Sequence, residues 1–308
     1  MIDLVLASCR ESWAAWFPDE PTPALSAVAM TRGRLDDRSL VLVLADRTPH
    51  PRLAVKVVWS PASIAAVEQE AAALRCLPAH FPGIPARVPR HLATLSFPHG
   101  AGMVTTFVPG ARWRVATHRW RRSPGVRTFL ARCAEVVDAT SCGMTTDGAA
   151  RPLSAMAPTV RWGAARMRGG PATSLGRLAQ VIASTDDPVV RGWQHGDLAL
   201  GNVLLADGTT PGIVDWEMAR EDLPAWFDAC YVPCALALDL GPDHQLVRWV
   251  VREVVAPRWQ AGFPLVWGLS LTALVSARRA ERQHRGAYER WLDVASGMLE
   301  LRTPREES

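Results

Sequence analysis

The sequence predicts an α+β protein of two lobes, a small β-rich lobe followed by a larger, mainly α-helical lobe. Short aliphatic runs separated by turn residues are typical of strands and dominate the first third of the chain. Beyond Pro109 and Gly110, where the chain must change direction, helical periodicity dominates. With 308 residues, 48% of them hydrophobic, the chain is long enough to bury two cores. We therefore expect one lobe over residues 1–108 and a second over 109–308.

The first lobe is expected to open with a short helix and a proline-rich connector. A helix is expected over 63–77, where Val67, Leu74 and Leu77 share one face with Glu70. Glu68 lies about 100° around that helix, where it can be solvated. Because a carboxylate on a packed face needs a partner, we expect Glu70 to pair with a cation, either Lys56 or an arginine. Strands are expected at 27–30, 40–45, 53–58 and 103–108, the first three as an antiparallel meander.

The second lobe shows helical patterns with two short strands between them. Apolar residues recur with helical spacing at 127–140, 175–184 and through most of 245–301. Short strands are expected at 203–205 and 212–216, joined by the turn DGTTPG as a hairpin.

Two residue types are almost absent from the chain. Of its 34 basic residues only Lys56 is a lysine, and Asn202 is the only asparagine. All the other basic residues of this chain are arginines. The single lysine therefore indicates a position that needs a compact ammonium and not a planar guanidinium. Asn202 offers a neutral carbonyl oxygen that can bind a hard cation. Chance is the alternative explanation for each single occurrence.

Composition excludes several classes of protein. No apolar run reaches the length of a membrane span, and the first residues lack the basic region of a signal peptide, which favours a cytoplasmic protein that contacts no membrane. A net charge of +4 is too small to indicate a nucleic-acid partner. The six cysteines have no zinc-site spacing and are expected to be free thiols.

The segment from Trp193 to Glu217 carries the chemically informative pattern. Folding it as a hairpin would bring Asn202 close to Asp215, so that an amide oxygen and a carboxylate form part of an octahedral Mg²⁺ site. Asp197 would lie nearby as an acceptor for a proton from a substrate hydroxyl. Taken singly, Asn202 is more often a turn former and Asp215 a strand-end cap. Glu217 is expected to be an exposed strand-end glutamate rather than a ligand of a second metal.

The pattern HGDxxxxN followed by IVDW resembles the motifs of the aminoglycoside phosphotransferase and choline kinase-like family, whose members have a bilobal protein-kinase-like fold. The resemblance implies that Asp197 is the catalytic base and that Asn202 and Asp215 hold Mg²⁺. It also implies that His195 braces the catalytic loop, and that Asp228 supports this loop from a later helix.

The resemblance extends into the first lobe. Lys56 in AVKV resembles the ATP-contacting lysine of the family, and Glu70 resembles its helix partner. By the same likeness the segment from Thr106 to Gly110 corresponds to the hinge, and the backbone near Thr106 and Val108 would bind adenine. The implied activity is transfer of the γ-phosphate of ATP, with Mg²⁺, to a hydroxyl of a small molecule such as an antibiotic or a metabolite.

Two segments depart from the family pattern. Between Met30 and Leu40 the only glycine is Gly33, where several would let backbone amides close on phosphates, and Asp36 and Asp37 add negative charge. The segment 110–135 holds seven arginines and one acidic residue, which favours a neutral or anionic acceptor over a polycationic one, or else marks a solvated helix face.

Two other functions stay open at this point. A nucleotide-binding pseudokinase or scaffold without turnover is suggested by the glycine-poor segment, although such a protein has no need for a catalytic base. A protein-serine kinase is disfavoured, because HGD replaces the HRD of those enzymes and no activation segment is recognisable after Asp215. The acceptor, the choice between ATP and GTP and the oligomeric state are not specified by the sequence.

Overall fold

The computed structural model describes residues 2–31, 37–46, 48, 50–80, 86–112, 153–184, 191–205, 211–259, 264–282 and 288–301. These residues belong to two units. The first comprises Met1–Pro82, Ala86–Ala111 and Leu204–Ala219, and the second comprises Gly83–Pro85, Arg112–Val203 and Arg220–Ser308. The sequence assigned 204–219 to the second lobe, whereas in the structure this segment belongs to the first unit.

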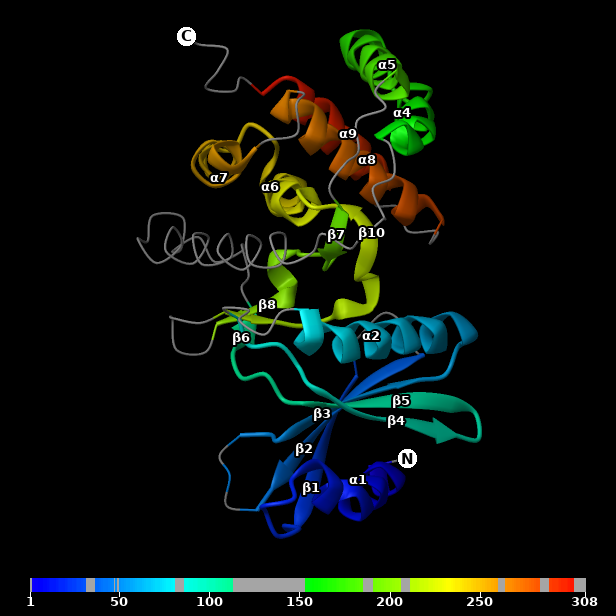
Figure 1. Ribbon diagram of the computed structural model, residues 1–308, viewed down its shortest axis with the longest axis vertical. Coiled ribbons are helices and arrows are strands. Elements are labelled where there is room, and N and C mark those ends of the chain that lie inside the picture. The colour runs from blue at the N-terminus through cyan, green and yellow to red at the C-terminus, as the bar shows by residue number, and fades with distance from the viewer. Residues whose placement is uncertain are drawn as a thin grey trace. The chain divides into compact units, whose positions relative to one another are not determined.

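An antiparallel sheet of five strands forms the centre of the first unit (Figure 1). Its order is β1-β2-β3-β5-β4, so the predicted meander of the first three strands is confirmed. The strand β4 was not predicted, although its apolar Ala93, Leu95 and Phe97 alternate with the exposed polar Thr94 and Ser96. The strands are β1 (Leu25–Thr31), β2 (Arg38–Ala45), β3 (Leu53–Val58), β4 (His91–Phe97) and β5 (Gly100–Thr106).

The two faces of this sheet have different environments. The helix α1 (Ile2–Trp16) packs on one face, where Trp13 and Cys9 join the buried valines of β2 and β3 in a hydrophobic core. Because side chains alternate along a strand, Lys56, between Val55 and Val57, faces the opposite side. This alternation directs the only lysine of the chain away from the hydrophobic core.

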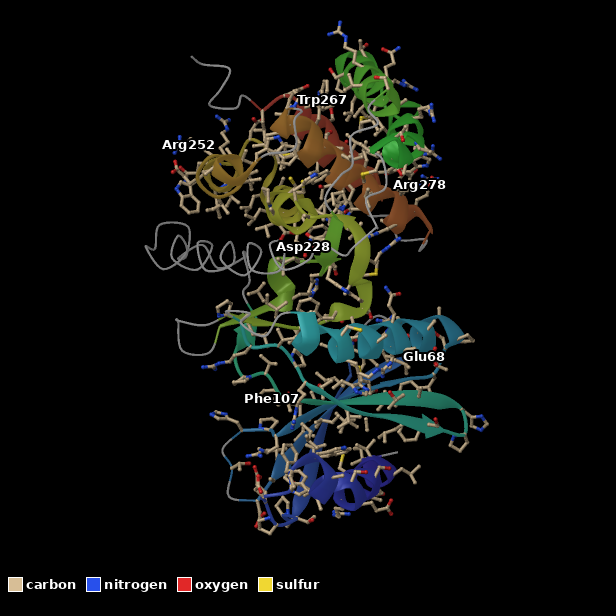
Figure 2. The ribbon with its side chains drawn as sticks, viewed as in Figure 1. Glu68, Phe107, Asp228, Arg252, Trp267 and Arg278 are labelled. Carbon is tan, nitrogen blue, oxygen red and sulfur yellow. The ribbon has the colours of Figure 1, made fainter. Side chains whose placement is uncertain are left out.

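The helix α2 (Pro61–His80) contacts β3, β4 and β5, and the predicted helix over 63–77 lies within it. Val67, Glu70 and Leu74 are buried, as the helical spacing predicted. Glu68 is exposed, also as predicted (Figure 2). The spacing of Val67, Glu70 and Leu74 along one helix face therefore correctly predicted which of the two glutamates is buried.

The second unit is mainly helical. The predicted helices at 175–184 and through most of 245–301 are confirmed, whereas the one predicted at 127–140 lies outside the described residues. A two-stranded antiparallel sheet joins β7 (Arg191–Gln194) to β10 (Arg220–Pro224). The main helices are α4 (Ala157–Ala164), α5 (Gly169–Ser184), α6 (Phe227–Leu240), α7 (Gln245–Val250), α8 (Leu265–Arg282) and α9 (Tyr288–Leu299). Within the described part of the chain, no helix combines the length and apolarity that crossing a membrane requires.

A small sheet of order β6-β8-β9 involves the segments around the predicted motif. Its strands are β6 (Ala111–Arg112), β8 (Val203–Leu205) and β9 (Pro211–Ile213). The predicted strands at 203–205 and 212–216 are present, but the second ends at Ile213, before Asp215. A 3₁₀ turn, η3 (Leu200–Asn202), precedes β8, and another, η4 (Trp216–Met218), follows Asp215.

Candidate active site

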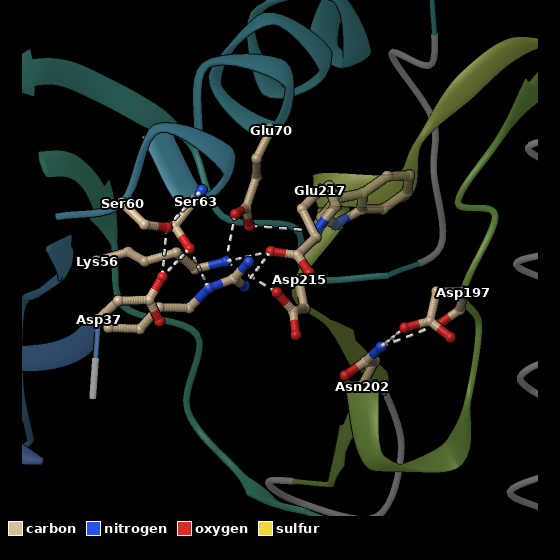
Figure 3. Close-up of polar contacts among 11 residues, drawn as sticks. Asp37, Lys56, Ser60, Ser63, Glu70, Asp197, Asn202, Asp215 and Glu217 are labelled. Atoms are coloured by element: carbon tan, nitrogen blue, oxygen red, sulfur yellow. Dashed lines mark hydrogen bonds and ion pairs between the residues drawn. The ribbon is translucent and has the colours of Figure 1, made fainter. Parts of the chain in front are cut away.

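In the first unit, Lys56 is held by two carboxylates that come from distant parts of the chain. Its Nζ donates to Glu70 Oε2 on α2 and, at 2.8 Å, to Asp215 Oδ1 (Figure 3). The pairing of Lys56 with Glu70 was expected from the sequence and is present. Glu70 Oε1 also accepts the backbone N–H of Trp216 at 3.2 Å. Glu70 therefore connects the lysine to the segment that carries Asp215.

The backbone at Asp215 has an unusual conformation. With φ at 72° it is the only non-glycine residue with positive φ in the described part of the chain. Aspartate adopts this left-handed conformation more readily than most residues, because its short polar side chain can hydrogen-bond locally. This conformation ends the strand β9 and begins the turn η4, which explains why the strand is shorter than predicted.

A second ion pair adjoins this group, and the sequence did not predict it. Glu217 Oε2 accepts from Arg38 at 2.7 Å and lies 3.9 Å from Lys56 Nζ. Only 19% of the Glu217 side chain is exposed, so the expectation of an exposed strand-end glutamate was wrong. The expectation failed because the chain turns at Asp215 and brings Glu217 back toward the sheet.

The charges of this group support one another. Burial alone would lower the pKa of Lys56, but the nearby carboxylates of Glu70, Asp215 and Glu217 raise it above its usual value, so the ammonium keeps its proton. Oxygens of these three carboxylates all lie within 4.8 Å of one another. Carboxylate oxygens so grouped are also the ligands that Mg²⁺ prefers.

Asp37, which is also in the first unit, lies near the start of α2. Its Oδ2 accepts from the hydroxyls of Ser60 and Ser63, both at 2.5 Å, at the start of α2. The neighbouring Arg38 donates from Nε to Ser63 Oγ at 3.1 Å. The negatively charged carboxylate of Asp37 is therefore hydrogen-bonded at the start of α2. Gly33 and Asp36 lie outside the described residues.

In the second unit, Asp197 and Asn202 lie side by side. Asn202 Nδ2 donates to the backbone oxygen of Asp197 at 2.9 Å and to its Oδ2 at 3.2 Å (Figure 3). Because the amide nitrogen faces Asp197, the carbonyl oxygen of Asn202, the atom that can bind a cation, faces away from it. Asn202 ends the short turn η3, and its backbone N–H donates to Ala199 O at 2.8 Å. The arrangement therefore involves only residues that are close together in the chain.

Asp228 supports the loop that carries Asp197, as expected from the sequence. The carboxylate of Asp228 (labelled in Figure 2), at the start of α6, is buried and accepts the backbone N–H groups of His195 and Gly196 at 2.5 and 2.9 Å. His195 is also buried, and its Nδ1 accepts the backbone N–H of Asp197 at 3.3 Å. The structural role predicted for His195 agrees with these contacts.

Two further residues of the second unit contact this loop, and neither was predicted from the sequence. Arg279 of α8 is buried and donates from Nη1 to Gly196 O at 2.7 Å. Tyr231, one turn after Asp228 on α6, donates its hydroxyl to Asp197 Oδ1. Arg279 is one of many arginines, and Tyr231 lies in an apolar helix, so only the packing of the helices reveals these roles.

A family model described as the phosphotransferase enzyme family matches residues 32–232. This match covers about two thirds of the chain and includes both groups of side chains except Arg279. The chain belongs to the phosphotransferase enzyme family. Among curated proteins, no sequence matches the chain.

Solved structures similar to this phosphotransferase include several aminoglycoside phosphotransferases. A thermostable mutant of APH(4)-Ia, in complex with AMP-PNP and hygromycin B, has a TM-score of 0.62 at 14% identity, covering 95% of this chain and 98% of that one. APH(3'')-Id from Streptomyces rimosus, with ADP and streptomycin, has a TM-score of 0.52 at 20% identity, covering 96% and 99%. At such identities these likenesses establish the fold, which is the bilobal protein-kinase-like fold predicted from the sequence.

The two residues predicted to bind adenine, Thr106 and Val108, lie at the end of β5 and just beyond it in this phosphotransferase. Thr106 ends the strand, and its backbone N–H donates to Arg90 O at 3.0 Å, so this donor already has a partner within the protein. Val108 lies beyond the strand and is buried. A base contact by Thr106 would therefore have to use its backbone oxygen.

Proposed function

We propose that this phosphotransferase transfers the γ-phosphate of ATP, with Mg²⁺, to a hydroxyl group of a small molecule. The observation that carries the proposal is the arrangement of Lys56 with Glu70 and Asp215. A protonated lysine held by a helix glutamate is the device with which kinases bind nucleotide phosphates. We also propose nucleotide contacts from the backbone at Thr106 and Val108, and location in the cytoplasm, where ATP is available.

Asp197 is the proposed catalytic base. It accepts the proton as the O–H bond of the substrate breaks, while the substrate oxygen bonds to the γ-phosphorus and the bond from phosphorus to the oxygen of ADP breaks. The loop that carries Asp197 is fixed by Asp228, which lowers the freedom of the base before the substrate binds.

Asp215 and Asn202 are the proposed ligands of Mg²⁺, and their chemistry fits this ion. Each offers an oxygen, and the Asn202 amide is oriented by its nitrogen so that the oxygen is directed away from Asp197. The bound ion would neutralise phosphate charge. Glu217 and Glu70 supply further carboxylate near Asp215, although both also pair with cations.

The acceptor is proposed only by class. Similar structures contain hygromycin B, kanamycin and streptomycin, which makes aminoglycosides the first compounds to test. The arginine-rich segment 110–135 lies mostly outside the described residues, and its charge favours neutral or anionic hydroxyl compounds. An acceptor panel should therefore include hydroxylated metabolites.

The deciding experiment compares purified Asp197→Ala and Asp197→Asn with the wild type. We expect phosphoryl transfer to be lost in both, while ATP binding, measured by calorimetry, stays close to wild type, because the base does not hold the nucleotide. Near wild-type transfer in these variants would reject the assignment of Asp197. The alternative, a nucleotide-binding pseudokinase, predicts ATP binding by the wild type without Mg²⁺-dependent transfer to any acceptor of a broad panel.

A further inference from the structure

Both oxygens of the Asp197 carboxylate accept hydrogen bonds from side chains of the second unit. Asn202 Nδ2 donates to Oδ2 at 3.2 Å, and the hydroxyl of Tyr231 donates to Oδ1. Each carboxylate oxygen has two lone pairs, so a substrate hydroxyl can still donate to either oxygen. The two donors therefore orient the carboxylate without removing its capacity to accept a proton.

Tyr231 is itself held rigidly. Only 6% of the residue is exposed, and its ring lies 6.0 Å from the ring of Phe227 and 5.6 Å from that of Trp291, centroid to centroid. Tyr231 follows Asp228 by three positions, so the two side chains share one face of α6. One helix face thus fixes the backbone of the catalytic loop through Asp228 and the carboxylate of Asp197 through Tyr231.

The hydroxyl of Tyr231 acts as a donor throughout the working pH range. Burial, together with the negative charge of Asp197, raises the pKa of Tyr231 well above its usual value. The phenol therefore keeps its proton and does not serve as the base itself.

We propose that Tyr231 is a positioning residue that orients the carboxylate of Asp197 for proton abstraction through its hydroxyl. This inference rests on the proposed function, in which Asp197 is the base. Misplacing a reacting group by about 1 Å costs about a hundredfold in rate, so loss of this contact is expected to lower kcat by about tenfold to a hundredfold.

The test compares Tyr231→Phe with Tyr288→Phe, since these are the two tyrosines of the chain. Tyr231→Phe keeps the aromatic ring that packs against Phe227 and removes only the hydroxyl. We expect a lower kcat with unchanged KM for ATP, and an acidic limb of the pH–rate profile shifted to higher pH, because a carboxylate that loses a donor is protonated more readily. Tyr288→Phe, at the start of α9, should match the wild type in kcat, in KM for ATP and in the pH–rate profile.

A second measurement does not depend on activity. With ¹³C-carboxyl-labelled aspartate, the resonance of Asp197, assigned through Asp197→Asn, should titrate at higher pH in Tyr231→Phe than in the wild type. Identical titration, or a wild-type kcat and pH profile, would overturn the role of Tyr231. If the resonance shifts but Asp197→Asn still transfers phosphate, the hydrogen bond is supported and the proposed function fails instead.

Discussion

Lys56 Nζ and Asp215 Oδ1 lie 2.8 Å apart although 159 positions separate the two residues in the chain. The contact joins β3 to the segment after β9, and Glu70 of α2 completes the group. An ammonium held between two carboxylates cannot leave without exposing them to mutual repulsion. The stability of the first unit and its proposed nucleotide binding therefore depend on the same side chain.

Replacing Lys56 with methionine should reduce both properties. We expect the KM for ATP to rise at least about tenfold, since the cation proposed to contact the phosphates is lost. The free energy of unfolding should fall by about 3 kcal/mol, because partly buried carboxylates lose their partner. Steady-state kinetics and urea unfolding measure the two effects. Arg75→Met, which removes an exposed cation from the same unit, is the control, and an equal loss in both variants would contradict the prediction.

Asn202 offers a way to separate the proposed metal binding from orientation of the proposed base, Asp197. Asn202→Ala removes the proposed oxygen ligand, so half-maximal activity should require a higher concentration of Mg²⁺. Asn202→Asp keeps an oxygen but loses the N–H donor to Asp197, so kcat should fall while the Mg²⁺ requirement stays nearer to wild type. Rates over a titration of free Mg²⁺ distinguish the two. An unchanged Mg²⁺ requirement in Asn202→Ala would remove Asn202 from the ligand set.

Asp228 should be needed for both folding and catalysis. In Asp228→Asn the amide nitrogen cannot accept a backbone N–H, so one of the two donors, His195 N or Gly196 N, is left buried without a partner. The cost is about 1–3 kcal/mol of unfolding free energy. The loop that carries Asp197 also loosens, which should lower kcat more than it raises KM. Thermal unfolding and kinetics check this, and a variant with wild-type stability would show that the buried carboxylate is not required.

Asp37 should contribute stability that depends on pH. The hydroxyls of Ser60 and Ser63 lower the pKa of its carboxyl, so the unfolded chain binds this proton before the folded one as the pH falls. The contribution is present above the usual pKa near 4 and is lost as the pH falls through the folded value. Urea unfolding of wild type and Asp37→Asn should differ most above pH 4 and converge at lower pH. A constant difference would contradict this account.

Two glycines in helices of the second unit should respond to alanine in opposite directions. A Cβ on Gly268 of α8 would collide with the ring of Trp259, so Gly268→Ala should destabilise the protein by about 1–3 kcal/mol. A Cβ on Gly176 of α5 meets nothing within 4 Å, so Gly176→Ala should stabilise it by about 0.5–1 kcal/mol. Thermal unfolding measures both, and the same sign for the two would refute the packing argument.

The sequence correctly predicted features that depend on residues close together in the chain. Helical spacing placed Glu70 on the buried face of α2 and Glu68 on the exposed face, and the five-residue interval from Asp197 to Asn202 kept both in one loop. The rarity of lysine singled out Lys56 before any contact was known. These predictions succeeded because the period of a helix and the length of a loop depend on neighbouring residues alone.

Tertiary structure decided the contacts that join distant segments. Arg38 pairs with Glu217, Tyr231 contacts Asp197, and Arg279 contacts the backbone of the loop that carries Asp197; none of these has a signature in spacing or composition. The left-handed turn at Asp215, which brings Glu217 back to the sheet, was likewise unforeseen. Burial and pairing of such groups depend on which elements pack together. The free energy of that packing is shared over the whole core, so no short stretch of sequence encodes it.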